Sequence, residues 1–287
     1  MGSPEIQNFE TIEGNIDNER KVTDEKLREG ADKLISLFCS EFQVDGKEYL
    51  VHVQEQTPDT KFIIASSHIS NLDAPAAIKA LGDRVDIQVT AESVLFKSLP
   101  HKIMFGLGGK DNFTPLEYKK EKDGKRGIFN PKDFQKLSEK VEEGKTPWMA
   151  IHPFTKKGEM QPSKIGAVFL AQKTGAKIIP TALEFESESI SLEGAGEITK
   201  GLLTRANGDG KATYHVGEPI DLAPIDTGII ELVFEKRAGK ERVTREEIEK
   251  FKEAHRMLQE QANQVAEKIA AMLPENQRGN LSKKQAA

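Results

Sequence analysis

Short apolar runs that alternate with helix-like segments constrain the fold of this chain more than any other feature. The runs read KFIIASS, DIQVTAE, PWMAI and KIIPTALEF, and polar residues bound each of them. Such runs are typical of strands buried in parallel sheets. Because helix patterns separate them, the chain of 287 residues predicts an α/β fold, with a mixed, largely parallel central sheet flanked by helices.

Three of the intervening segments have recognisable helix ends. In APAAIKALG, Pro75 fits the first turn and Gly82 ends the helix. In NPKDFQKLSEKVEEGK, Asn130 can cap the helix and Gly144 ends it. The third helix is predicted over residues 163–175, which are rich in apolar side chains.

The two ends of the chain differ from the middle. Residues 1–22 are polar and predict a flexible segment, followed by an α/β domain over 23–240 that opens with a helix. Residues 241–287 form a C-terminal helix and tail, in which Thr244 and Glu247 match a capping box and Pro274 stops the helix. Because its polar face mixes Glu with Lys, we expect this helix to pack across the main domain rather than lie on anionic lipid.

Three further segments are assigned by composition. KEYLVHV and ATYHVG have the apolar and β-branched residues of strands. Residues 107–128 are rich in Gly and Lys, and we expect them to form a long loop.

The stretch SSHISNLDAP, which follows the first apolar run, places His68 five residues before Asp73. Five residues do not share a face of one helix, so the two side chains can meet only if His68 lies in the turn after the strand. The helix must then begin at or after Asp73. Strand ends that feed helices are where α/β proteins bind ligands.

A carboxylate can fix the tautomer of an imidazole that takes a proton from a hydroxyl. A structural alternative is that Ser70 and Asp73 form a capping box. No other histidine is followed by an aspartate at this spacing, because the residues there are Thr57, Gly106, Lys157, Ile220 and Glu260. The spacing therefore favours chemistry modestly over capping.

From Lys61 to Ile220 the sequence resembles the glycerophospholipid acyltransferase family in the order of its motifs. The first family motif is Asn-His, four residues and Asp, and SHISNLDAP matches it with Ser67 in place of Asn. The third motif is Phe-Pro-Glu-Gly-Thr-Arg and its following helix, and IHPFTKKGEMQPSKIGAVFLA keeps Pro153 and Thr155. The fourth motif is an apolar strand that closes on proline, as IIPTAL does at Pro180.

The chain departs from this pattern where the family holds a phosphate-bearing acceptor. Phe154 replaces the Glu-Gly of the third motif with the loss of one residue, Lys156 replaces its Arg, and GGKDNF is a poor match to the second motif. These changes bear on the acceptor rather than on acyl transfer. Lys156 and Lys157 could pair with a phosphate as point charges, or form a solvated turn.

The resemblance implies an O-acyltransferase that moves an acyl group from acyl-CoA or acyl-carrier protein to a hydroxyl of a glycerol-phosphate or lysophospholipid-like acceptor. His68 would be the general base and Asp73 would orient it, while Ser67, Ser70, Pro153, Thr155, Lys156, Lys157 and Pro180 would contribute to substrate binding. No resident cofactor or metal is implied. Two alternatives stay open: a catalytically impaired acyl- or lipid-binding protein of the same fold, and a hydrolase in which the pair activates water.

The remaining features limit the class of protein. A formal net charge of −5 gives no indication of a nucleic-acid partner. The single cysteine, Cys39, excludes an internal disulfide and fits a buried apolar position, as does Trp148. His152 is either a neighbour of the site or a structural histidine. With no signal peptide or long apolar run, the sequence predicts a cytoplasmic protein that would meet a membrane only at its surface.

Overall fold

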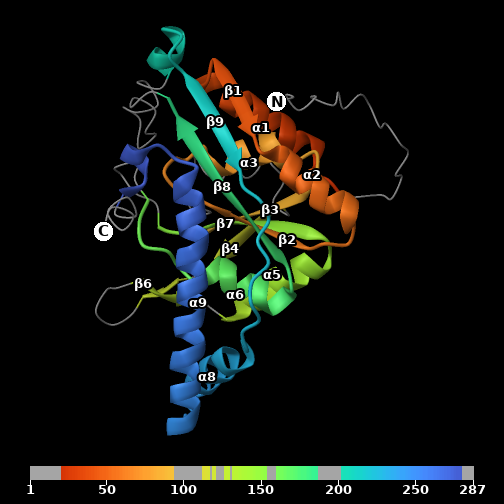
Figure 1. The fold of residues 1–287 in the computed structure, drawn as a ribbon. Coiled ribbons are helices and arrows are strands. Elements are labelled where there is room, and N and C mark those ends of the chain that lie inside the picture. The colour runs from red at the N-terminus through yellow and green to blue at the C-terminus, as the bar shows by residue number, and fades with distance from the viewer. Residues whose placement is uncertain are drawn as a thin grey trace, which may run out of the picture.

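The computed structural model describes residues 21–93, 112–116, 118–120, 126–129, 131–153, 160–186 and 202–279. A seven-stranded sheet in the order β1-β9-β8-β2-β7-β3-β4 runs through the molecule (Figure 1). Its strands are β1 (Glu41–Asp45), β2 (Phe62–Ser66), β3 (Asp86–Glu92), β4 (Phe113–Leu116), β7 (Lys145–Ala150), β8 (Lys177–Phe185) and β9 (Lys211–Val216). All neighbouring strands pair in parallel except β8 and β9, so the predicted mixed, largely parallel sheet is confirmed.

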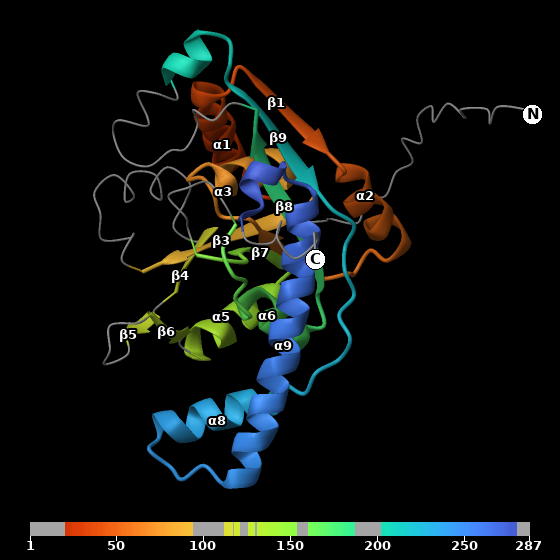
Figure 2. The ribbon, with the colours of Figure 1, turned by 60° about the vertical axis from the view of Figure 1, so that its left-hand side comes forward.

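Helices cover both faces of the sheet (Figure 2). Helices α1 (Glu25–Phe38) and α3 (Asp73–Leu81) enclose one hydrophobic cluster with the sheet, and α2 (Lys47–Gln56) lies beside β9. Helices α5 (Pro131–Glu142), α6 (Gly166–Thr174) and α9 (Arg245–Ala271) enclose a second cluster on the opposite face. Each strand of the sheet centre is therefore buried on both sides, as its continuous apolar sequence requires.

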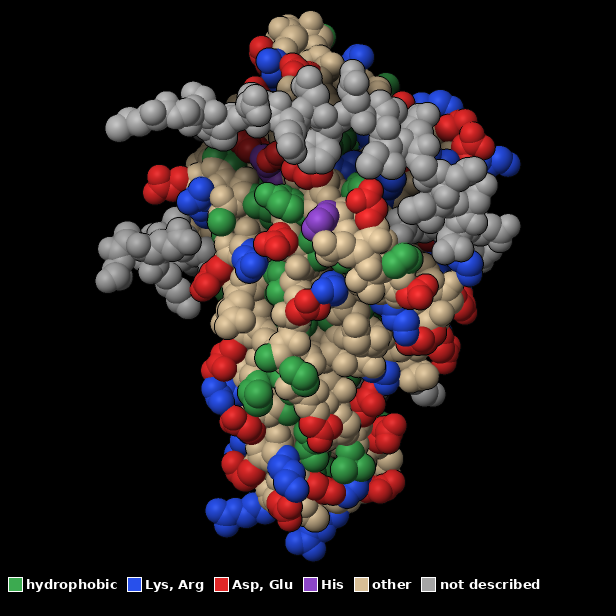
Figure 3. Space-filling view, turned by 45° about the vertical axis from the view of Figure 1, so that its right-hand side comes forward, with side chains coloured by type: hydrophobic (Ala, Val, Ile, Leu, Met, Phe, Trp, Pro, Cys, Tyr) green, Lys and Arg blue, Asp and Glu red, His purple; other side chains and the backbone are tan. Residues whose placement is uncertain are grey.

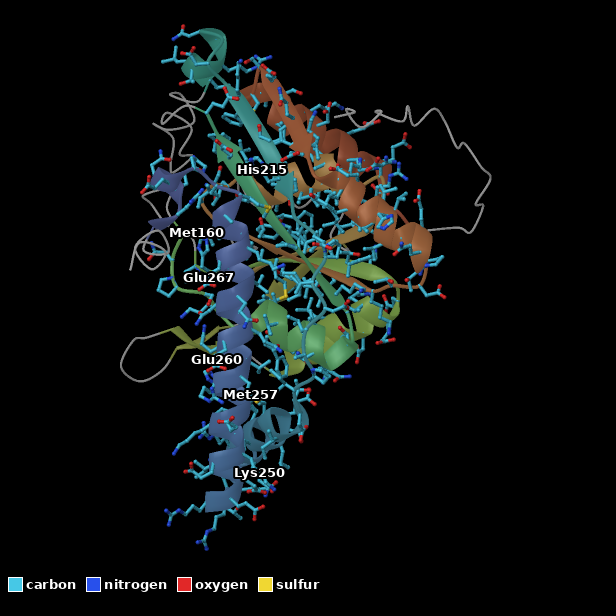
Figure 4. The ribbon with its side chains drawn as sticks, in the orientation of Figure 1. Met160, His215, Lys250, Met257, Glu260 and Glu267 are labelled. Carbon is cyan, nitrogen blue, oxygen red and sulfur yellow. The ribbon has the colours of Figure 1, made fainter. Side chains whose placement is uncertain are left out.

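Helix α9 packs against the main domain through one apolar stripe, as predicted. Ala254, Leu258 and Val265 are buried in the second cluster, while Glu260 and Glu267 lie along its exposed side (Figure 4). Thr244 and Glu247 form both hydrogen bonds of the capping box. Since each apolar side chain removed from water stabilises a fold by about 1.5–3 kcal/mol, this stripe binds α9 firmly.

Helix α8 (Gly228–Ala238) pairs with the N-terminal half of α9, and the two project beyond the sheet (Figures 1 and 2). The rings of Phe234 and Phe251 meet edge to face with centroids 6.0 Å apart, and the Arg237 guanidinium lies 5.4 Å from the Phe251 ring centroid. Sequence analysis did not predict α8 or strand β1.

The predicted strand KEYLVHV is wrong, because these residues form helix α2. Gly46, in the left-handed region at φ +80°, turns the chain sharply after β1 and begins the helix. Leu50 and Gln54, four residues apart, are buried on one face of α2, and Val53 packs beside them. The apolar residues at 50 and 53 fit a helical period, and their β-like composition concealed it.

The predicted loop at 107–128 is also wrong in part. Its described residues include β4, which pairs with β3 at the edge of the sheet, and a two-stranded antiparallel sheet of β5 (Tyr118–Lys120) and β6 (Arg126–Phe129). Edge strands have few buried positions, so a polar composition did not exclude them. The expectations for residues 1–20 and for the cap at Asn130 lie outside the described residues.

Neither positive nor negative charge dominates the face shown in Figure 3, where acidic and basic side chains are mixed and hydrophobic side chains form small separate groups. Cys39 is buried, and this burial raises the pKa of its thiol to about 11, as expected for an unreactive apolar residue. In the described part of the chain, no helix is both long enough and apolar enough to cross a bilayer.

Candidate active site

The site is built where two neighbouring parallel strands end. Strands β2 and β7 pair side by side, so their carboxyl ends lie at the same edge of the sheet. His68 follows β2 by two residues and His152 follows β7 by two residues. The register between the strands therefore brings the two histidines together although 84 residues separate them.

His68 and Asp73 meet as their spacing requires. Helix α3 begins at Asp73, which confirms the predicted start of the helix. His68 Nδ1 lies 3.2 Å from Asp73 Oδ2, and the His68 side chain is 28% exposed whereas that of Asp73 is fully buried. An ionised carboxylate only accepts hydrogen bonds, so Nδ1 of a neutral His68 carries the proton and its Nε2 carries the lone pair.

The capping box that was the alternative to chemistry does not form, because Leu72 precedes α3 and no side chain caps the helix, but Asp73 does hold the preceding turn. Its Oδ2 accepts the Ser70 N–H at 2.9 Å, and the Ser70 hydroxyl oxygen accepts the Leu72 N–H at 3.1 Å. These contacts tie the turn between His68 and α3 to the helix start. One carboxylate oxygen thus contacts both the turn and the imidazole, so the same group holds the turn and orients His68.

Burial raises the pKa of Asp73 above its usual value, although the hydrogen bonds from His68 and Ser70 lower it. The carboxylate lies at the first residue of α3, where the helix N-terminus favours a negative charge. Its ionised form therefore depends on the donors that surround it.

His152 is a second fixed imidazole of this site. It is buried, its Nδ1 donates to the Pro153 carbonyl at 2.9 Å, and its Nε2 accepts the His68 backbone N–H at 3.2 Å. Burial lowers the pKa of His152 to about 4, with the Pro153 carbonyl opposing this shift. A neutral His152 can accept the His68 N–H over the whole physiological pH range. The two alternatives for His152 are therefore compatible, since it is a buried, hydrogen-bonded histidine and also lies next to His68.

Trp148 of β7 lies edge to face with the His68 ring, with centroids 5.9 Å apart and planes at 81°. The Trp148 side chain is buried, as its sequence context predicts. This contact limits the rotation of the imidazole. The orientation of His68 is thus fixed by a carboxylate, an indole and a backbone hydrogen bond.

The other predicted site residues lie at different distances from this pair. Ser67 is buried and its N–H donates to the Thr181 carbonyl, and Pro153 follows His152 at the end of β7. Pro180 lies inside β8 beside Ala65, so its side chain faces away from the side of the sheet that Thr181 occupies. Thr155, Lys156 and Lys157 lie outside the described residues.

Sequence reasoning missed a group of buried polar residues on the central strands, which includes Ser66, Thr181 and Tyr214. A signal existed for Tyr214, since ATYHV alternates between buried and partly exposed positions and places the tyrosine inward. Its proximity to the site depends on strand order, which the sequence does not reveal. No group of side chains among the described residues has the arrangement of a metal site.

Comparison with known proteins finds likenesses among solved structures. No family model matches the chain, and no curated protein matches it. Among solved structures, the chain is similar to the crystal structure of the 1-acyl-sn-glycerophosphate (LPA) acyltransferase PlsC from Thermotoga maritima, at 15% identity and a TM-score of 0.46. The alignment covers 84% of this chain and 78% of that one.

Proposed function

We propose that the protein is an O-acyltransferase that uses an acyl thioester, acyl-CoA or acyl-carrier protein, and a hydroxyl acceptor of the glycerol-phosphate or lysophospholipid class. The observation that carries the proposal is the contact between His68 Nδ1 and Asp73 Oδ2 at the carboxyl end of β2. The resemblance of SHISNLDAP and the later motifs to the acyltransferase family supports the choice of reaction.

In this mechanism, His68 is the general base. Its Nε2 takes the proton from the acceptor hydroxyl while the hydroxyl oxygen attacks the thioester carbonyl. The carbon–sulfur bond then breaks, and the leaving thiolate takes the proton back from the imidazolium. Asp73 holds the tautomer that places the lone pair on Nε2 and stabilises the imidazolium between the two steps. No covalent acyl-enzyme forms, so the reaction does not require a cysteine.

The partial exposure of His68 and the full burial of Asp73 suit these roles. An acceptor can reach the imidazole, while the carboxylate lies behind it and out of water, where its charge acts more strongly on the imidazolium. His152 adds to this arrangement by holding the His68 backbone without competing for the proton.

For the acceptor, we propose that Thr155, Lys156 and Lys157 bind the phosphate of the headgroup, with Ser67, Ser70 and Pro153 shaping the walls near His68. Pro180 has no such role, because its side chain faces the opposite side of the sheet. Lysine binds phosphate as a point charge, without the bidentate grip of arginine. A lysophospholipid acceptor resides in a bilayer, so we expect the protein to work in the cytoplasm and to contact the membrane peripherally.

The test is acyl transfer by wild type and by His68→Ala, with acyl-CoA or acyl-carrier protein as donor and a panel of lysophospholipids and alcohols as acceptors. Mass spectrometry of the products should show transfer by wild type and a loss of about 10²–10⁴-fold in the variant, the range expected for a general base. His52→Ala is the matched control, because His52 is exposed on α2 and should keep full activity.

Three results would contradict the proposal. Equal turnover by wild type and His68→Ala would show that His68 is not the general base. Binding of the donor by wild type without any product would favour the acyl- or lipid-binding alternative, and release of free fatty acid without an acceptor would favour a hydrolase. Thermal unfolding of both variants establishes that each is folded.

A further inference from the structure

A set of buried polar side chains lies on four adjacent strands beside Asp73. Ser66 is on β2, Thr181 on β8, Trp148 on β7 and Tyr214 on β9. The polar atom of each side chain is inaccessible to solvent and lacks a hydrogen bond of good geometry within the described part of the chain, and the same holds for Asp73 Oδ1. The Tyr214 hydroxyl nevertheless lies near enough to Thr181, Ser66 and Trp148 for weak hydrogen bonding. Buried polar groups are almost always paired, so a cluster of this kind points to a partner.

The register of the sheet places these side chains on one face. Ser66 pairs directly with Thr181 across β2 and β8. Tyr214 pairs with Leu183, two residues from Thr181, and Trp148 lies two residues before the partner of Ser66 on β7. Residues two apart on a strand share a face, so all four side chains point to the side that α3 covers.

Tyr214 is close enough to each of these groups to interact with it. Thr181, Ser66 and Trp148 lower the pKa of the Tyr214 hydroxyl, but burial and the charge of Asp73 raise it further, so the hydroxyl stays protonated. The hydroxyls of serine, threonine and tyrosine both donate and accept, whereas the indole N–H of Trp148 only donates and an ionised Asp73 Oδ1 only accepts. A water molecule can donate one hydrogen bond to the carboxylate and form three more with the hydroxyls, by accepting from two of them and donating to the third.

We propose that Tyr214 is a positioning residue for Asp73, and that one internal water molecule joins its hydroxyl, together with those of Thr181 and Ser66, to Asp73 Oδ1. Internal waters typically bind two to four buried polar groups that the chain leaves unpaired. The carboxylate would then be held through both oxygens: Oδ2 by Ser70 and His68, and Oδ1 by the water. The second anchor would keep Asp73 ionised in spite of its burial.

The first test is the tautomer of His68, measured by NMR on protein with ¹⁵N-labelled histidine. In wild type the Nδ1–H form should dominate. In Tyr214→Phe, Asp73 loses an anchor, so the Nδ1–H resonance should weaken and the Nε2–H form should appear. Tyr49→Phe is the matched control, since Tyr49 is 46% exposed and its hydroxyl lies outside the cluster. An unchanged His68 tautomer in Tyr214→Phe would overturn the proposal.

The melting temperature Tm gives a second test, because Tyr214→Phe should change it in opposite directions depending on whether the Tyr214 hydroxyl is anchored or unpaired. If the Tyr214 hydroxyl is anchored, its removal should lower the Tm. If it is merely an unpaired buried group, Tyr214→Phe should raise the Tm, because the cost of burying the hydroxyl disappears. Thr181→Val provides an independent variant of the cluster that should shift the His68 tautomer in the same direction. A crystal structure should show one water within hydrogen-bonding distance of both Asp73 Oδ1 and the Tyr214 hydroxyl, and its absence would refute the proposal.

The inference rests on the proposed function only for its effect on turnover. There, Tyr214→Phe should reduce kcat about 10- to 100-fold, as loss of a hydrogen bond to a charged group would, with little change in KM. The NMR and unfolding measurements need no substrate. A wild-type protein without acyltransferase activity would refute the proposed function and leave these two tests of Tyr214 intact.

Discussion

Acidification should weaken the fold through His152, which is buried in its neutral form beside His68. In the unfolded chain this imidazole has its ordinary pKa of 6.5, whereas in the folded protein burial lowers the pKa to about 4. Between these two values the unfolded state binds a proton that the folded state does not. The contribution of His152 to stability is therefore complete above pH 6.5 and is lost as the pH falls toward 4.

The size of the effect follows from the two pKa values. One pKa unit corresponds to 1.36 kcal/mol, so the full penalty below pH 4 is about 3 kcal/mol, and at pH 5 it is about 2 kcal/mol. This is a large share of the stability of an ordinary domain. Because the pKa of Asp73 is raised, its protonation changes the free energy of unfolding in the opposite direction. Wild type and a His152 variant both keep Asp73, so this effect cancels when the two are compared.

The perturbation is His152→Gln, whose side-chain oxygen can still accept the His68 N–H but cannot be protonated. Urea unfolding at several pH values, followed by the fluorescence of Trp148, the single tryptophan, gives the free energy of unfolding. Between pH 8 and pH 5, wild type should lose about 2 kcal/mol more than the variant. His52→Gln is the control and should follow wild type, because His52 is exposed. If wild type and His152→Gln lose stability in parallel, His152 is not a buried neutral imidazole and the reasoning fails.

Four further substitutions test other parts of the structure. Asp73→Asn should abolish acyl transfer yet raise the Tm at pH 7, because the raised pKa of Asp73 means that its charge opposes folding at neutral and higher pH; a lower Tm would contradict this. Gly46→Ala should destabilise the fold by more than 1 kcal/mol, roughly the cost of a left-handed alanine alone, since its Cβ would lie 2.0 Å from the Val216 carbonyl oxygen. By contrast, Gly30→Ala in α1 meets no atom within 4 Å and should stabilise by about 0.5–1 kcal/mol in urea unfolding. Thr244→Ala should cost about 1 kcal/mol by removing the cap of α9, and an unchanged midpoint would show that the capping box contributes nothing.

The sequence predicts best those features that depend on neighbours along the chain. DIQVTAE and KIIPTALEF form strands with the predicted ends, and the start of α3 at Asp73 follows from the requirement that His68 and Asp73 meet. Helix α6 begins three residues later than predicted. The reason is tertiary: the Ser163 hydroxyl donates to Asn263 of α9 and the Lys164 N–H donates to the Ile151 carbonyl, so these residues are held outside the helix.

Features that depend on strand order were beyond sequence reasoning. The hydrogen bond from His68 to His152 exists because β2 and β7 are neighbours, and Tyr214 reaches the site because β9 turns antiparallel beside β8. Neither of these strand pairings can be recognised from the local pattern of residues. The misassigned helix α2 has a different cause, since a single glycine, Gly46, decides where the chain turns.

The interlocking of the β2 and β7 ends has a consequence for how the site comes into being during folding. His68 and Asp73 lie close in the sequence, but the partners that fix the imidazole, Trp148 and His152, come from a strand made some 80 residues later. Contacts at such separation form only after a long loop has closed, a slow event in folding. A nascent chain that ends before β7 would already carry His68 and Asp73 but would lack the indole and the imidazole that fix the His68 ring. The orientation of His68 would thus be fixed only after β7 has paired with β2, and a partly folded chain would lack it.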